Sequence, residues 1–328
     1  MLVRLLVGVA ILGLTAVLGL TAITGWLWSR ADVSTIGQLS FSNPLKIPPL
    51  LHPRVDGTGQ KVFELRLQQG ASELLPGKPT ETWGVNGAYL GPTLRVARGD
   101  RVAMQVTNNL PEPTTIHWHG MHLPAAADGG PHQVIEPGAT WTPSWTVDQP
   151  AATLWYHPHP HGVTDRHAYR GLSGLVLLDD PQASGLPLPY RYGIDDIPVV
   201  VQDKRFDDEG NLELGNQPFD LAGRLGSQIL INGTYDPHLA VTTQRVRLRL
   251  LNASTARTYN FGFTDDRAFD MIATDGGLLE HTHPTTRIPL SPGERAEVVV
   301  TFQPGERVVL RSFKPDLGMN FVQRRFAG

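Results

Sequence analysis

The sequence predicts an all-β protein in which two tandem β-sandwich domains follow one N-terminal hydrophobic helix. Three observations lead to this prediction. Val102, Met104 and Val106 alternate with less apolar residues, which is the period-2 pattern of a half-buried strand. The same strand and turn landmarks recur later in the chain. The chain also contains 34 Gly and 27 Pro, a content that suits many short strands joined by turns.

The N-terminal segment is the one long apolar stretch of the sequence. No charged residue occurs from Leu5 to Trp28, and Arg4 and Arg30 flank this stretch. A helix needs about 20 apolar residues to span the core of a bilayer. We therefore expect residues 1–30 to form a transmembrane signal-anchor, with a cleaved signal peptide as the alternative, because cleavage-site patterns near Ala22 and Gly25 are weak. Either possibility places the rest of the chain outside the cytoplasm.

Residues 31–58 contain Pro and Ser without clean periodicity and are expected to form a linker. The first β domain is expected over residues 59–182, where the turn Arg98–Asp100 joins the strands Thr93–Ala97 and Arg101–Thr107. A boundary is expected in the Pro-rich stretch Pro181–Pro189, and the second domain over residues 190–328.

The second domain repeats landmarks of the first in the same order. The repeated pairs are Asn86-Gly87-Ala88-Tyr89 with Asn232-Gly233-Thr234-Tyr235, Arg101–Thr107 with Arg245–Leu251, and Glu136-Pro137-Gly138 with Ser291-Pro292-Gly293. Any two all-β domains share Asn-Gly turns and alternating strands. The order and spacing nevertheless favour an internal duplication.

Composition excludes several classes of function. The net charge of −3 comes without any basic run, which argues against a nucleic-acid partner. The cysteine count is zero, which excludes disulfides, thiolate zinc sites, a Cys nucleophile and a lipoprotein anchor.

Two His-x-His pairs are the candidate metal site. Residues i and i+2 of a strand point to the same face, so His117 and His119 present two imidazoles together. His157 and His159 each precede a proline, which favours extended backbone there. Two such pairs on neighbouring strands can bring four nitrogens together. A site built from imidazoles alone suits copper, zinc or iron.

The remaining histidines are expected not to bind the metal. His281 and His283 form a third pair, but in a Thr- and Pro-rich loop, where we expect solvated surface. The other histidines are isolated and are expected at the surface or beside the ligands: His52, His122, His132, His167 and His238. His161 also falls in the second histidine cluster.

The histidine motifs resemble those of multicopper oxidases. Thr114–Pro124 followed by Asp128–Pro131 is similar to the first copper motif, and Val147–Ala151 followed by Trp155–Gly162 to the second. The segments Gly171–Leu175, Gly193–Pro198 and Asp275–Leu279 continue the likeness. It covers nearly everything after residue 58 and is strongest to bacterial periplasmic cuprous oxidases and laccase-like relatives.

The resemblance implies a fold, a metal and residue roles. It implies two cupredoxin-like (Greek-key) sandwiches, a periplasmic location with the N-terminal segment in the inner membrane, and copper as the cofactor. By motif, His117 would bind the type 2 copper, and His119, His157 and His159 the type 3 pair of a trinuclear cluster. The residue matching His161 is not a ligand in that family, so His161 is expected to be a hydrogen-bonding neighbour of the site. Asp128 matches an acidic residue that assists proton delivery during O2 reduction, and its alternative role is an Asp-Gly turn residue.

The sequence departs from the family where the type 1 copper site should be. That site needs a cysteine thiolate, and in three-domain members it lies in a third domain that also supplies the other cluster histidines. We therefore expect this chain to carry half of the cluster and to be inactive alone. Three explanations are open: a truncated oxidase, a subunit completed by a separately encoded third domain, and a non-enzymatic copper-binding or cell-division-type structural relative.

Overall fold

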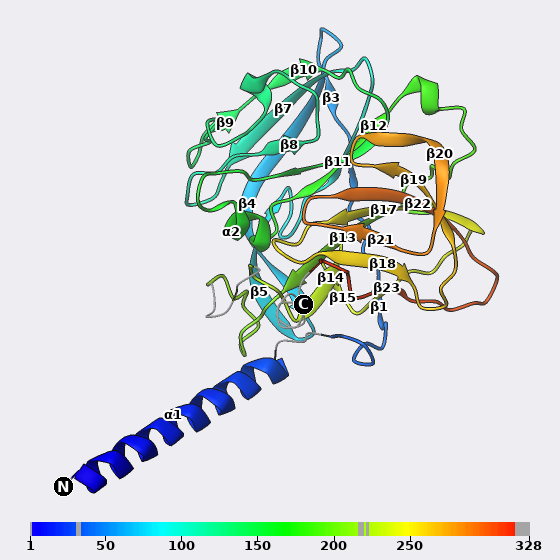
Figure 1. The fold of residues 1–328 in the computed structure, drawn as a ribbon. Helices are drawn as coiled ribbons and strands as arrows, with labels where there is room; N and C mark the ends of the chain where they lie inside the picture. The colour runs from blue at the N-terminus through cyan, green and yellow to red at the C-terminus, as the bar shows by residue number, and fades with distance from the viewer. Residues whose placement is uncertain (1, 31–33, 216–219, 221–222, 319–328) are drawn as a thin grey trace.

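The computed structural model describes residues 2–30, 34–215, 220 and 223–318 of the chain. One long helix projects from a body made of two β-sandwiches (Figure 1). The predicted all-β class with an N-terminal helix is confirmed. The final residues of the expected second domain, 319–328, lie outside the described residues.

The N-terminal helix α1 (Leu2–Arg30) points away from both sandwiches (Figure 1). Its segment Val7–Trp26 is long and apolar enough to cross a membrane, and none of it is buried against the rest of the chain. A helix that is apolar all round and touches no protein core suits a signal or membrane anchor rather than a core helix.

The first sandwich has a six-stranded and a five-stranded sheet. The six-stranded sheet has the order β10 (Ser144–Thr146), β7 (Arg101–Asn108), β4 (Lys61–Leu75), β3 (Arg54–Val55), with β5 (Lys78–Val85) on β4 and β9 (Thr140–Trp141) on β7. The five-stranded sheet has the order β2 (Leu50–Leu51), β6 (Thr93–Ala97), β12 (Gly174–Asp179), β11 (Ala152–His157), β8 (His117–His119). The short helices η1 (Ala125–Ala127) and α2 (Thr164–Arg170) lie in its loops. Phe63, Met104, Trp118 and Tyr156 are among the side chains of its core.

The second sandwich follows η2 (Pro181–Ala183) and has a seven-stranded and a three-stranded sheet. The larger sheet has the order β15 (Thr234–Tyr235), β14 (Gln228–Ile231), β13 (Asp196–Lys204), β17 (Arg245–Asn252), β22 (Arg295–Thr301), β19 (Phe269–Thr274), β20 (Gly277–Thr285). The smaller sheet has the order β21 (Ile288–Leu290), β18 (Tyr259–Phe263), β23 (Leu310–Ser312). Its core is rich in Val, Leu and Phe.

The repeat predicted from the sequence corresponds to a repeated set of contacts. Asn86 and Asn232 both have positive φ, and the side-chain oxygen of each accepts a backbone N–H bond, from Arg66 and Val200 respectively. Strand β4 pairs in parallel with β7, as β13 does with β17. At the far ends of β7 and β17, the carbonyls of Asn108 and Asn252 accept bonds from the N–H groups of Gly138 and Gly293. These matched contacts support a common origin for the two units.

The segment expected to be a linker is partly built into both sandwiches. β2 and β3 lie within residues 31–58 and extend the two sheets of the first sandwich, while β1 (Asn43–Pro44) pairs with β16 (Pro237–His238) of the second. Asp236 also accepts hydrogen bonds from Ser40, Phe41 and Ser42. Two-residue strands are too short to show periodicity, which is why the sequence pattern indicated a linker. Residues 31–33 lie outside the described part of the chain.

The two sandwiches pack through the face of β11 and β12 that points away from the first core. Trp155, Leu175 and Leu177 of the first sandwich cluster with Val200 and Leu251 of the second. Because Trp155 and His157 are two residues apart on one strand, they share this face. The packing of the two sandwiches therefore places the histidine strand beside the second domain.

Candidate metal centre

The two histidine pairs are placed by the edge strand β8 of the five-stranded sheet and by its neighbour β11. β8 and β11 are antiparallel neighbours, with His117 opposite His157 and His119 opposite Trp155. Trp118 lies in the core of the first sandwich, 1% exposed, so the strand alternation turns His117 and His119 to the opposite face. The local pattern of one buried aromatic between two histidines thus fixes which way the imidazoles point.

Three of the four predicted ligands come together closely. Ligand nitrogens of His117, His119 and His157 all lie within 4.8 Å of one another. His159, just beyond the end of β11, is not part of this triplet, although its ring centroid lies 5.5 Å from that of His117 and 5.9 Å from that of His157. Its backbone N–H donates to Oγ1 of Thr115 at 2.8 Å, which fixes the Pro-His-Pro loop beside β8. His161 is exposed.

Hydrogen bonds leave a lone pair on the imidazoles. Nδ1 of His157 lies 2.8 Å from the carbonyl oxygen of Pro158, which can only accept, so Nδ1 carries the proton and Nε2 carries the lone pair. That Nε2 lies 3.2 Å from Nδ1 of His119. Likewise Nδ1 of His117 donates to Asp128, whose carbonyl oxygen lies at 3.0 Å and whose Oδ2 lies at 3.2 Å. Nε2 of His117 is then the available nitrogen.

The surroundings keep two of these rings neutral. Burial lowers the pKa of His157 to about 3, with the neighbouring imidazoles adding to the shift. Burial also lowers the pKa of His119 to about 4, with the Arg295 guanidinium as the next cause. A metal ligand must be the unprotonated imidazole. Converging neutral nitrogens without a carboxylate in the triplet fit a borderline or soft metal such as copper, and not calcium or magnesium.

Asp128 lies at the edge of this cluster. It ends η1, and its side chain is 39% exposed. The next residue, Gly129, has φ +76°, and a β-carbon there would lie 1.7 Å from the carbonyl oxygen of Ile116. Only glycine permits this close approach, which brings the Asp128 loop onto β8. Asp128 is therefore both a turn residue and a neighbour of His117, so the two roles considered for it are compatible.

Three further residues belong to the site and were not predicted as parts of it. The indole of Trp155 stacks on His157, with ring centroids 4.1 Å apart, and lies 5.3 Å from His119. Gly293 of the second sandwich lies against His119 and Trp155, since a β-carbon there would be 3.5 Å and 3.7 Å from them. Arg295 donates to the carbonyl of Thr153 on β11. Trp155 begins the segment that resembles the second copper motif, and Ser291-Pro292-Gly293 was recognised only as a repeat landmark. No comparable signal in the sequence pointed to Arg295.

The other histidines divide into exposed groups and one buried group. His281 and His283 are exposed, on strand β20 rather than in a loop. His52, His122, His132 and His238 are also exposed. The prediction of a surface or ligand-neighbour position was wrong for His167, which is fully buried: Nδ1 lies 2.9 Å from Oγ1 of Thr114, and the ring packs edge-on against Trp83. The turn of α2 directs it inward, which residue spacing does not reveal.

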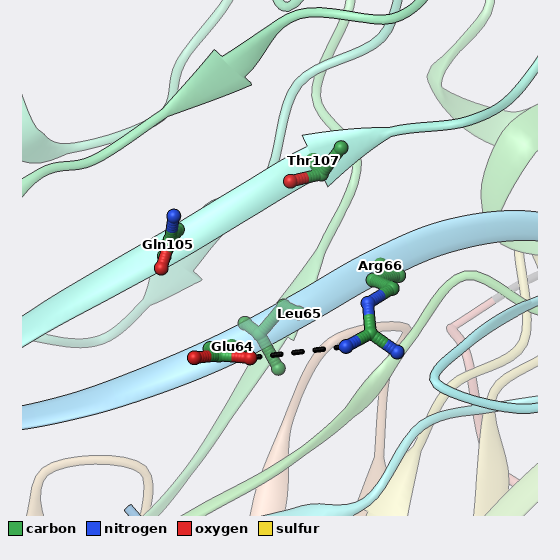
Figure 2. A pocket seen from close by; sticks show the side chains of 5 residues that line it. All are labelled: Glu64, Leu65, Arg66, Gln105 and Thr107. Atoms are coloured by element: carbon green, nitrogen blue, oxygen red, sulfur yellow. Dashed lines mark ion pairs between the residues drawn. The ribbon is translucent and has the colours of Figure 1, made fainter. Parts of the chain in front are cut away.

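A small surface depression lies on the other sheet of the first sandwich. Figure 2 shows its lining residues Glu64, Leu65, Arg66, Gln105 and Thr107, with an ion pair between Glu64 and Arg66. These residues come from β4 and β7, whereas the histidines lie on β8 and β11 of the facing sheet. The depression therefore has no part in the metal centre.

Known proteins resemble this chain over most of its length. Sequence profiles of multicopper oxidases match residues 66–183 and residues 208–312. A multicopper oxidase, mco, of Staphylococcus aureus is 41% identical over 258 residues, which are 79% of this chain and 57% of that protein. The cell division protein FtsP of Xenorhabdus nematophila is 41% identical over 271 residues, which are 83% of this chain and 56% of that protein.

Solved structures agree with the sequence matches. The crystal structure of a laccase from Pediococcus acidilactici has a TM-score of 0.78 and 40% identity, covering 82% of this chain and 59% of that chain. The predicted cupredoxin-like sandwiches are thus confirmed. This chain spans somewhat more than half the length of these relatives. On these grounds, the chain belongs to the multicopper oxidase family.

Proposed function

We propose that this chain binds copper through His117, His119, His157 and His159 and supplies half of a trinuclear copper site. The main support for this proposal is the convergence of neutral imidazole nitrogens from β8 and β11. Family membership implies copper as the cofactor. Copper held by imidazoles supplies one-electron redox chemistry, which in this family couples oxidation of a substrate to reduction of O2 to water.

Within this proposal, the protein groups orient the ligands and handle protons. The Pro158 carbonyl directs Nε2 of His157 toward the site, and the Asp128 carbonyl does the same for His117. The carboxylate of Asp128 is partly exposed and 3.2 Å from Nδ1 of His117, so its Oδ2 can take a proton from solvent and hold it at the edge of the site. We propose it as the acid that delivers protons for O2 reduction.

The oxidase activity needs groups that this sequence does not contain. With no cysteine, the chain cannot form a type 1 copper site by itself. We propose that a third cupredoxin domain, as a separately encoded partner or as part of a longer gene product, completes the cluster and supplies that site. The chain alone should then consume no O2 with cuprous ion or phenols as reductant.

A second candidate is a structural role of the cell-division type. The identity to FtsP proteins, 41% for that of Xenorhabdus nematophila, favours it. Such a role needs no copper, so retention or loss of copper by the histidine site separates the two proposals.

We also propose that the chain is periplasmic and is held in the inner membrane by α1. The exposed apolar face of Val7–Trp26 supports this location. Fractionation of cells should recover the full chain with membranes. Recovery of a soluble chain shortened at its N-terminus would instead indicate a cleaved signal.

Copper analysis of the purified full chain in detergent tests the main proposal. After copper loading and dialysis, we expect about one or two coppers per chain. The double variant His117→Ala with His157→Ala should lose them. The matched control, His281→Ala with His283→Ala, removes an exposed His-x-His pair from a strand and should keep them. Equal copper content in the two double variants would overturn the assignment.

A further inference from the structure

Arg295 reaches from the second sandwich to the back of the histidine site. Its side chain is 3% exposed. Nε donates to the carbonyl of Thr153 on β11 at 3.0 Å, while Nη1 and Nη2 donate to the carbonyls of Gly293 and Asp275 at 3.1 and 2.9 Å. Thr153 is four residues before His157 on the same strand and face. Arg295 thus joins the two sandwiches directly behind the proposed ligands.

Two glycines show how closely this arginine and its turn approach the histidine His119. A β-carbon on Gly120, the residue after His119, would lie 2.8 Å from Nη2 of Arg295. A β-carbon on Gly293, two residues before Arg295, would lie 3.5 Å from the ring of His119. Bulk water cannot occupy a gap of this size between guanidinium and ligand strand.

The charge of Arg295 is therefore poorly screened toward the site. Arginine stays protonated in proteins, and at this depth the effective dielectric constant is far below that of water. Its counter-ion is Asp275, with Oδ1 at 2.7 Å from Nη1, but the Asp275 side chain is 47% exposed. The solvated carboxylate is screened more strongly than the buried guanidinium. The second sandwich thus places a buried positive charge beside the proposed ligands, and the carboxylates of Asp275 and Glu294 partly offset it.

We propose that Arg295 is a positioning residue by which the second domain biases the histidine site toward Cu(I) over Cu(II). A fixed positive charge disfavours the more highly charged ion, so it raises the reduction potential of bound copper. The inference rests on the proposed copper binding at this site. It gives the second domain a role in the chemistry of the centre beyond packing.

Separate Cu(I) and Cu(II) affinities of the full chain test this inference. Competition with a chelator specific for each ion gives the two constants for the first copper bound. In Arg295→Met, which removes the charge and keeps much of the volume, we expect the ratio of Cu(II) to Cu(I) affinity to rise about tenfold. That change lowers the reduction potential by about 59 mV. Arg295→Lys keeps the charge and should restore most of the wild-type ratio.

Two further variants separate charge from structure. Asp275→Asn keeps an acceptor for Arg295 but removes the negative charge, so the ratio should shift the opposite way. Arg257→Met removes another buried arginine, one that pairs with Asp203, and should leave the ratio unchanged. If Arg295→Met does not fold, Asp275→Asn tests the inference by itself: a fall in the ratio of Cu(II) to Cu(I) affinity supports it, and a rise contradicts it.

The outcomes distinguish the inference from the proposed function. Wild-type protein that binds neither copper ion at the histidines overturns the proposed function and the inference with it. The inference alone is overturned if wild-type protein binds copper and Arg295→Met has the same affinity ratio as wild type. It is also overturned if Asp275→Asn shifts this ratio in the same direction as Arg295→Met.

Discussion

At the scale of single residues, two oxygens of Asp128 orient the ring of His117. Asp128 presents both its backbone carbonyl and its carboxylate to the same Nδ1–H. The carbonyl makes the shorter contact, 3.0 Å against 3.2 Å, so we expect it to hold the ring when the carboxylate is absent. The carboxylate is then available for proton transfer.

Asp128→Asn should therefore retain copper while losing proton delivery. The variant keeps the backbone carbonyl, and an amide cannot take up a proton near neutral pH. Metal analysis of the full chain is expected to give the wild-type copper content. A loss of copper as large as that of the His117→Ala, His157→Ala variant would mean that the carboxylate holds the site together instead.

Residue spacing predicted the convergence of the histidines better than it predicted what surrounds them. In the His-x-His pattern, the apolar Trp118 points to the core, so the two histidines must point to the opposite face. This follows from the local alternation of side chains along a strand. The sequence around Arg295 gives no such indication, because Arg295 contacts Thr153, which lies 142 residues away in the sequence. The burial of His167 likewise depends on how α2 packs against the first sandwich. Contacts of this kind arise from tertiary packing and cannot be read from the local pattern.

At the scale of elements, β11 is tied to the second sandwich by a buried charge network. Thr153 Oγ1 donates to Oε1 of Glu297 at 2.6 Å, and Arg249 donates to the same oxygen at 3.1 Å. Arg247 donates to Oε2 at 2.6 Å, and Arg249 also pairs with Asp196. Glu297 is 1% exposed, so its charge depends on these partners.

Removing this carboxylate should destabilise the interface between the sandwiches. Glu297→Ala leaves Arg247 buried without its partner, at an expected cost of about 3–5 kcal/mol in the free energy of unfolding. Chemical denaturation of the full chain measures this cost. The control Glu306→Ala breaks a partly exposed pair with Arg267 and should have a much smaller effect. Similar losses in the two variants would contradict a stabilising role for the network.

The same carboxylate predicts an acid dependence of stability. Burial alone would raise the pKa of Glu297, but Arg249 and Arg247 outweigh it and hold this pKa below the usual value. Its stabilising contribution is thus present above the unfolded-state pKa and is lost as pH falls through the folded-state pKa. Glu297→Gln should flatten this part of the stability–pH curve, and an unchanged slope would exclude Glu297 as its source.

At the scale of the whole molecule, the sequence predicted the architecture where patterns are long or repeated. The apolar run of α1 and the repeated Asn-Gly turn with its following strand reappear as structure because each is set by local residues. The segment around β1, β2 and β3 did not, because strands of two residues form only where a partner strand from elsewhere in the chain is in place: β6 for β2, β4 for β3 and the equally short β16 for β1.

The packing of the two sandwiches covers one side of the histidine site. The first sandwich supplies the imidazoles, and the second covers their inner side with Gly293 and Arg295. The site is thereby shielded by the second domain, while His159 remains exposed on the other side. The exposed His159, a proposed ligand, and the edge strand β8 are features that a completing domain could pair with.

Anomalous diffraction at the copper absorption edge, from crystals of the copper-loaded chain, tests the central claim most directly. We predict an anomalous peak among the ring nitrogens of His117, His119 and His157, with His159 turned toward it, and no peak in the His117→Ala, His157→Ala variant. Copper found only elsewhere, for example at His281 and His283, or no bound copper at all, would contradict the assignment of this cluster as the copper site.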